Sequence, residues 1–157
     1  HPTAPPPNHG LAASWTASRS LDGAPGQEDP FGLAGDPAAD TDGDGFSALV
    51  EYGLGASDSV AGDASKLMTG ELVDFPAGES AARYLTVRFR RNLLAHNSVS
   101  LEPEVSTGLA GWTGGAALVL VSEEDHGDGT ATVTYRSASP VPAAPQQFIR
   151  LRATPIP

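Results

Sequence analysis

The sequence contains no cysteine. Disulfide bonds, thiol chemistry and zinc–thiolate sites are therefore excluded, so something other than a covalent cross-link must stabilise any loop-rich part of the fold. No apolar run approaches the roughly 20 residues that a membrane span needs. Basic residues are also scarce: 9 Lys and Arg stand against 19 Asp and Glu, for a net charge of −10. So acidic a chain lacks the basic face that nucleic acid or an anionic membrane requires, and cations are the expected partners.

Turn-forming residues, by contrast, are abundant. The chain has 18 glycines and 14 prolines among 157 residues, and 39% of it is hydrophobic. This length can bury one sizeable core, so we expect one principal domain with a prefix, rich in turns and poor in helix. Because the chain starts at His1, we also expect a processed product or a fragment of a longer protein.

Residues 40–51 read DTDGDGFSALVE and match the twelve-residue EF-hand calcium pattern without a gap. Acids at alternate positions direct their carboxylates to one centre, and Gly45 at position six permits the sharp turn. Ala48 at position nine has no ligating side chain, so water is expected there. The predicted ligands are four carboxylates and the main-chain carbonyl at position seven: Asp40, Asp42, Asp44, Glu51 and Phe46.

The expected ion is Ca²⁺, with an affinity on the order of 10⁻⁷ to 10⁻³ M. The preceding residues 31–37 read FGLAGDP, in which two glycines and a proline oppose an entering helix. A loop followed by only one helix cannot open a helix pair, so the sequence favours a structural role over calcium sensing. The alternative is an acidic, glycine-rich turn that binds nothing.

Downstream of the loop, apolar residues at helical spacing predict a short helix that begins near Ser47 and ends at Gly53 and Gly55. Residues 56–64 form a polar connector, in which Asp58 and Asp63 do not repeat the ligand spacing. From residue 66 onward the period changes to two. Strands are predicted at six segments: 67–75, 84–90, 99–105, 116–121, 131–137 and 147–153.

The strand pattern also predicts which side chains are buried. In residues 84–90, we expect Leu85, Val87 and Phe89 inward and Thr86, Arg88 and Arg90 outward. Residues 118–121 are apolar on both faces and predict a central strand. Residues 123–129 predict a hairpin that turns at Asp128 and Gly129. The predicted fold is mainly β: an antiparallel β-sandwich preceded by an EF-hand-like calcium loop and one short helix.

These segments together resemble a known family. The quoted stretches are FGLAGDP (31–37), ADTDGDGF (39–46), LVEYGLG (49–55), VSTGL (105–109) and QFIRLR (147–152), with WT at 112–113 and the hairpin at 125–134. They resemble the C-terminal calcium-loop plus β-sandwich module of secreted bacterial proteins, notably of the Verrucomicrobia and Planctomycetes lineages. The loop alone is similar to one unit of a dockerin or of a thrombospondin type 3 repeat. The resemblance implies an extracellular, calcium-bound module without catalytic activity.

We therefore expect three parts: a proline-rich extended arm or linker (1–14), a calcium-loop and short-helix segment (15–65) and a β-sandwich (66–157). The expected function is a calcium-stabilised module for anchoring, adhesion or assembly, located outside the cell or on its surface. It would bind another surface protein or its own copies, with residues 1–10 pairing to a sheet edge of the next subunit in a filament. The alternative is a carbohydrate-binding module that stacks sugars on Trp15 and Trp112.

An enzyme is the third hypothesis, and we expect none. Glu102 and Glu104 share a strand face at a separation of about 6.5–7 Å, which overlaps the range of inverting glycosidases. His126 with Asp125 and Asp128 could hold a metal or form part of a triad, although hairpin tips commonly use these residue types. A row of outward arginines could bind an anionic polymer or pair with cross-strand acids: Arg88, Arg90, Arg150 and Arg152.

Overall fold

The computed structural model describes residues 36–141 and 146–156. Features predicted before residue 36, including the proline-rich arm and Trp15, lie outside the described residues. The elements follow in the order α1 (Ala48–Leu54), η2 (Ala64–Leu67), β1 (Met68–Ala77), β2 (Ser80–Asn92), η3 (Leu93–Ala95), β3 (Val99–Ser106), η4 (Gly115–Ala117), β4 (Leu118–Asp125), β5 (Thr130–Ser137) and β6 (Phe148–Pro155). The η elements are single 3₁₀ turns. Over the described residues, the prediction of a mainly β chain with one short α-helix is confirmed.

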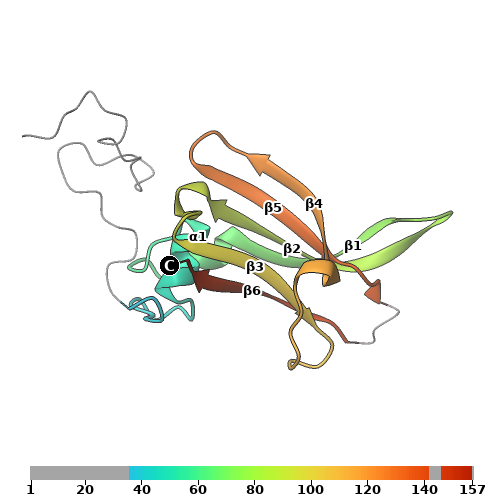
Figure 1. The fold of residues 1–157 in the computed structure, drawn as a ribbon, viewed down its shortest axis with the longest axis horizontal. Helices are drawn as coiled ribbons and strands as arrows, with labels where there is room; N and C mark the ends of the chain where they lie inside the picture. The colour runs from blue at the N-terminus through green and yellow to red at the C-terminus, as the bar shows by residue number, and fades with distance from the viewer. Residues whose placement is uncertain (1–35, 142–145, 157) are drawn as a thin grey trace, which may run out of the picture.

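The strands form two antiparallel sheets, which are shown in Figure 1. One has four strands in the order β1-β2-β5-β4, and the other pairs β3 with β6. Hairpins connect β1 to β2 and β4 to β5, whereas β6 returns from the end of the chain to pair with β3. Among the described residues, no helix has the length and apolar character needed to cross a membrane.

All six predicted strands are present, and most of the predicted inward residues are buried. Val87 and Phe89 of β2 are 2% and 1% exposed. Thr86 corrects the pattern: it was predicted to face solvent but is only 1% exposed. Its hydroxyl donates to the main-chain oxygen of Glu71 at 2.7 Å. Arg136 lies opposite Thr86 in the register, and its guanidinium lies over the ring of Tyr84, two residues before Thr86 on β2. Large side chains therefore cover this part of the outer face.

Strand β4 corrects a second prediction. Residues 118–121 were expected in a central strand, but β4 lies at the edge of the four-stranded sheet and pairs only with β5. Val119, Leu120 and Val121 are 38–49% exposed. Within residues 36–141 and 146–156, β4 has one strand neighbour only, so its apolar side chains do not mark a central strand.

Helix α1 packs against both sheets at one end of the molecule (Figure 1). Its Leu54 is fully buried in a core cluster with Val87 and Phe89 of β2, Leu101 of β3 and Val133 of β5. Ile149, Leu151 and Ala153 of β6 pack against the same cluster. The helix packs on β3 at Gly53, where a Cβ would lie in ordinary van der Waals contact, 3.4 Å from Val99 Cγ1. The helix is therefore part of the core.

The β3–β6 pair carries a partly buried ion pair. Glu104, which is 9% exposed, accepts from Arg150 Nε at 2.9 Å and Nη2 at 2.7 Å, with Arg152 Nη1 at 3.4 Å. The hydrogen bonds from Arg150 lower the pKa of Glu104. These two members of the arginine row therefore pair with a cross-strand acid.

Replacing Glu104 with Gln should reduce the amount by which the free energy of unfolding falls as the pH is lowered. A carboxyl whose pKa is lower in the folded chain adds stability above its unfolded pKa, and this stability is lost as the pH falls through the folded pKa. We expect E104Q to destabilise the chain by about 1–3 kcal/mol at pH 7 and by less near pH 3. Urea unfolding at both pH values measures this; an equal loss at both would show that the charge is not the cause.

Candidate metal centre

The acidic loop is shaped by its first aspartate. Asp40 Oδ1 accepts from the N–H groups of Gly43 at 2.8 Å and Asp44 at 3.1 Å, and Oδ2 accepts from Gly45 at 3.0 Å. Gly43 and Gly45 adopt φ of 78° and 93°, in the left-handed region that favours glycine. The Asp-Gly-Asp-Gly sequence thus folds back on Asp40, which brings the following acids to one side of the turn.

Two overlapping groups of acids meet at this turn. One oxygen from each of Asp40, Asp42 and Asp44 lies within 4.8 Å of the others, and the same holds for Asp44, Glu51 and Asp63. Asp44 belongs to both groups. The structure therefore brings the four predicted carboxylates together and adds a fifth, Asp63, from the connector.

Glu51 is the most unusual of these residues. It lies on α1, where burial of Leu49 and Leu54 fixes the helix against the core, and its side chain is 0% exposed. Neither of its carboxylate oxygens has a hydrogen-bond partner among the described residues. Burial, followed by the charges of Asp42, Asp44 and Asp58 and by a carboxyl–carboxyl contact with Asp58, raises the pKa of Glu51 from 4.5 to about 7. An uncompensated buried carboxylate is costly, and a cation is the usual compensation.

Two further buried oxygens near Glu51 also lack partners among the described residues: Asp42 Oδ2 and Asp63 Oδ1. Their sister oxygens are bonded, because Asp42 Oδ1 accepts from Asp44 N–H at 3.1 Å and Asp63 Oδ2 accepts from Ser57 N–H at 3.0 Å. Burial is also the largest cause that raises the pKa of Asp42. Each carboxylate is therefore oriented through one oxygen while the other is left free.

The connector, residues 56–64, is hydrogen-bonded to the acidic loop at two places. Gly62 N–H donates to Asp44 Oδ2 at 2.7 Å, and Thr41 donates its N–H and hydroxyl to the two oxygens of Asp58 at 3.1 and 2.7 Å. The bonds from Thr41 lower the pKa of Asp58. Asp58 thus holds the connector in place and keeps its charge beside Glu51.

The donor set fits a hard divalent cation. All the free donors are carboxylate oxygens, which suit calcium and magnesium and not the softer transition metals. Oxygens bound to one Ca²⁺ lie at most about 5 Å apart, and both groups of acids fall within 4.8 Å. Phe46 donates its N–H to Asp44 Oδ1 at 2.9 Å, and its ring packs on the core cluster; that its carbonyl is a ligand stays a prediction.

Three comparisons bear on what this chain is related to. Neither the family models, nor the curated proteins, nor the solved structures contain a match to it.

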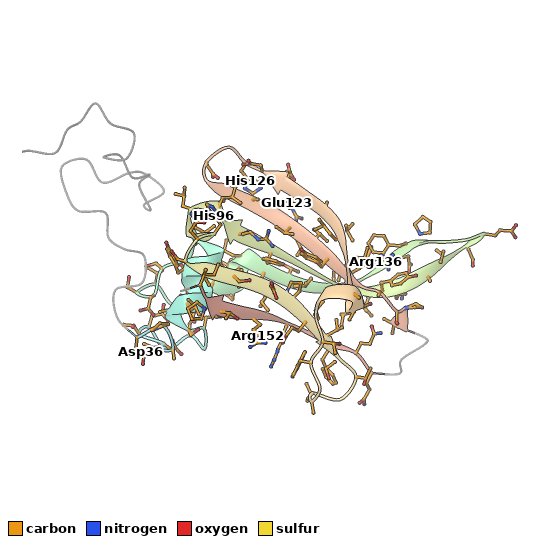
Figure 2. All side chains as sticks on the ribbon, in the orientation of Figure 1. Asp36, His96, Glu123, His126, Arg136 and Arg152 are labelled. Carbon is orange, nitrogen blue, oxygen red and sulfur yellow. The ribbon has the colours of Figure 1, made fainter. Side chains whose placement is uncertain are left out.

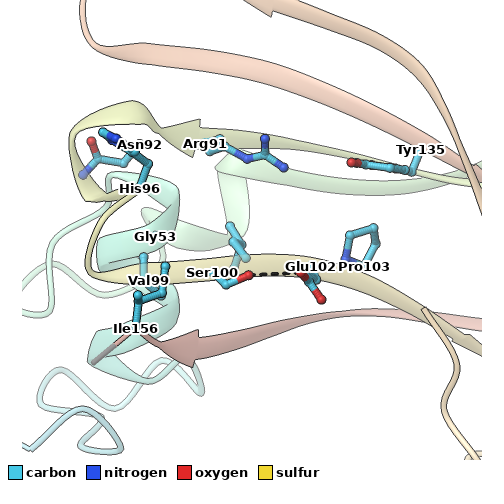
Figure 3. A pocket seen from close by; sticks show the side chains of 11 residues that line it. Gly53, Arg91, Asn92, His96, Val99, Ser100, Glu102, Pro103, Tyr135 and Ile156 are labelled. Atoms are coloured by element: carbon cyan, nitrogen blue, oxygen red, sulfur yellow. Dashed lines mark hydrogen bonds between the residues drawn. The ribbon is translucent and has the colours of Figure 1, made fainter. Parts of the chain in front are cut away.

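The two glutamates of the enzyme hypothesis lie in different surroundings. Glu102 lines a pocket of about 310 Å³ between β3 on one side and β2 and β5 on the other, and Figure 3 shows its hydrogen bond from Ser100 at 3.2 Å. Glu104 does not line this pocket and is bound by Arg150. An acid whose pKa is lowered in this way is a poor proton donor near pH 7.

His126 lies at the β4–β5 hairpin, far from Asp36 and the acidic loop (Figure 2). Its Nδ1 and Nε2 lie 3.1 Å from Thr130 Oγ1 and 3.0 Å from Thr132 Oγ1. Asp125 and Asp128 accept main-chain N–H groups of the turn. All three residues therefore have local partners that shape the hairpin.

Trp112, one of the two predicted sugar platforms, is half-buried. The guanidinium of Arg150 lies 4.2 Å from the centre of its ring. This cation–π contact occupies one face of the indole, which leaves less of the ring for a sugar. Trp15 lies outside the described residues.

If the acids bind a cation, replacing Glu51 with Gln should have opposite effects on stability without and with calcium. At pH 8 with chelator present, E51Q should be more stable than the wild type by about 1–3 kcal/mol, because the substitution removes a buried charge and gives its acidic neighbours an N–H donor. In millimolar calcium the order should reverse, since the variant lacks a charged ligand. Urea unfolding under both conditions measures the difference.

Glu102→Gln is the matched control, since Glu102 is exposed and lies on β3. It should change stability little in either condition. If E51Q is less stable than the wild type by the same amount with chelator and with calcium, Glu51 is a packing residue only.

Proposed function

We propose that this chain is an extracellular, calcium-stabilised structural or interaction module, in which an EF-hand-like loop and short helix precede an antiparallel β-sandwich. It serves anchoring, adhesion or assembly and performs no catalysis. The observation that carries the proposal is Glu51, a fully buried carboxylate in a cluster of acids, for whose two oxygens the described part of the chain provides no hydrogen-bond partner.

The ion has a structural role in this proposal. Helix α1 has seven residues, which is too short to be stable alone. Its N-cap residue, Ser47, makes no side-chain capping bond, so packing and the ion must hold it. Because α1 contacts β2, β3 and β6, an ion that binds Glu51 stabilises the junction of the two sheets.

The chemistry of the site supports the proposed extracellular location. An exposed acidic loop that needs calcium to fold is best served where calcium is millimolar. A chain without cysteine cannot use disulfides there, and a structural ion provides an alternative cross-link. The sequence resemblance to secreted bacterial modules supports the same location.

Calcium should raise the unfolding temperature of the intact chain. At a free calcium concentration of 100 Kd the stabilisation is about 2.7 kcal/mol, or roughly 5–10 °C for a chain of this size. Differential scanning calorimetry with 5 mM calcium and then with chelator measures the shift. Magnesium at the same concentration should shift it less, since the ion demands a tighter octahedral site. An identical unfolding temperature with calcium and with chelator would refute the proposal.

The assembly part of the proposal rests on β4. Among the described residues β4 is an edge strand, and edge strands can accept an added strand. It also has three exposed apolar side chains, those of Val119, Leu120 and Val121. The occupant we propose is the N-terminal segment of a second copy, because residues 1–35 precede the described chain and begin with the predicted extended arm. Each subunit would then offer one segment and one edge, which generates a filament.

Deleting residues 1–10 should abolish filaments that the intact chain forms in calcium, as observed by negative-stain electron microscopy. Leu120→Lys should do the same by placing a charge on the β4 edge. Leu72→Lys is the matched control, because Leu72 is 53% exposed on β1, the opposite edge strand. Unchanged fibres from the deletion, or none from the intact chain, would remove the assembly role and leave the calcium role in place.

A further inference from the structure

We infer that Asp63 is a direct ligand of the same cation, so that the site is completed by a residue outside the twelve-residue loop. The inference rests on the proposed calcium role and extends it. Asp63 lies in the connector between α1 and η2, and its carboxylate forms a group with Asp44 and Glu51 in which the three oxygens lie within 4.8 Å of one another. The sequence pattern had placed it outside the ligand set.

The hydrogen bonding of Asp63 separates its two oxygens. Oδ2 accepts from Ser57 N–H at 3.0 Å, whereas Oδ1 is buried and has no partner among the described residues. The two free oxygens of Glu51 have the same property, and Glu51 is 0% exposed. Asp63 and Glu51 thus each offer an oxygen within 4.8 Å of the other residue, and each has a buried oxygen without a partner among the described residues. A cation that both residues bind explains the two observations together.

The backbone around Asp63 is fixed by contacts that do not involve its free oxygen. The neighbouring Gly62 has φ of 82° and donates its N–H to Asp44 Oδ2 at 2.7 Å. The Thr41 to Asp58 bonds hold the same connector from its other end. The position of Asp63 Oδ1 is therefore set before an ion binds, which lowers the entropic cost of using it as a ligand.

Adding Asp63 changes what the ion does. In a loop with ligands only from residues 40–51, the ion would cross-link the loop to α1. With Asp63 as a ligand, the ion also cross-links the connector to the loop and to α1. The next residue, Ala64, is buried in the core cluster and begins η2, which leads directly into β1. A fifth carboxylate also increases the negative charge of the site, which tunes calcium affinity upward.

The test compares Asp63→Asn with the wild type in the full chain by isothermal titration with calcium chloride. D63N should weaken binding by at least about 10-fold, because it replaces a charged ligand with a neutral one. Asp125→Asn is the matched control: Asp125 also holds one main-chain N–H, that of Gly127, but lies at the far hairpin. Asp63→Glu keeps the charge and moves the oxygen, so it should also weaken binding if contact matters and leave it unchanged if only charge does.

A second measurement uses the wild type alone. With carboxyl-labelled aspartate, the ¹³Cγ resonance of Asp63 should shift when calcium is added, as should that of Asp42, whereas that of Asp125 should not. This readout remains valid if D63N does not fold.

The outcomes separate this inference from the proposal beneath it. Calcium binding that D63N and D125N weaken equally, with no shift of the Asp63 resonance, overturns the Asp63 ligand and leaves the calcium module standing. A wild-type chain that binds no calcium overturns both. A tenfold loss confined to D63N and D63E, with a shifted Asp63 resonance, establishes the ligand.

Discussion

The structure depends on how the charge of Glu51 is compensated. This carboxylate is buried at the base of α1, beside the acids of the loop and the connector, and the described residues offer it no donor. Repulsion among these groups acts to separate the loop, the helix and the connector. A divalent cation bound among these groups, as we propose, would convert the same arrangement into an attraction.

The position of this cluster explains why it matters beyond the loop. Helix α1 contributes Leu54 to a core shared by both sheets, and Leu49 to a second cluster with Ala95 and Val99. The two-stranded sheet also packs on this core directly, through Leu101 of β3 and Ile149 and Leu151 of β6, and it carries the ion pair of Glu104 with Arg150. An ion that stabilised α1 would therefore also stabilise the contacts that the helix makes with both sheets.

Sequence patterns predicted the parts of this molecule that depend on local periodicity. The alternation in β2 and β6, the glycine that ends α1 and the grouping of Asp40, Asp42 and Asp44 are all local, and the structure has them. The position of β4 was wrong, because an apolar run does not reveal how many neighbours a strand has. Asp63 was missed because its approach to Glu51 depends on the path of the connector, which no ligand spacing encodes. The adjacent Gly62-Asp63 pair was the signal in the sequence that could have pointed to Asp63.

The most direct test of the central claim is an anomalous difference map from crystals grown in millimolar calcium. The account predicts a single peak with oxygens of Glu51 and Asp42 at about 2.3–2.6 Å. Carboxylates turned into solvent, with no anomalous peak among them, would contradict it.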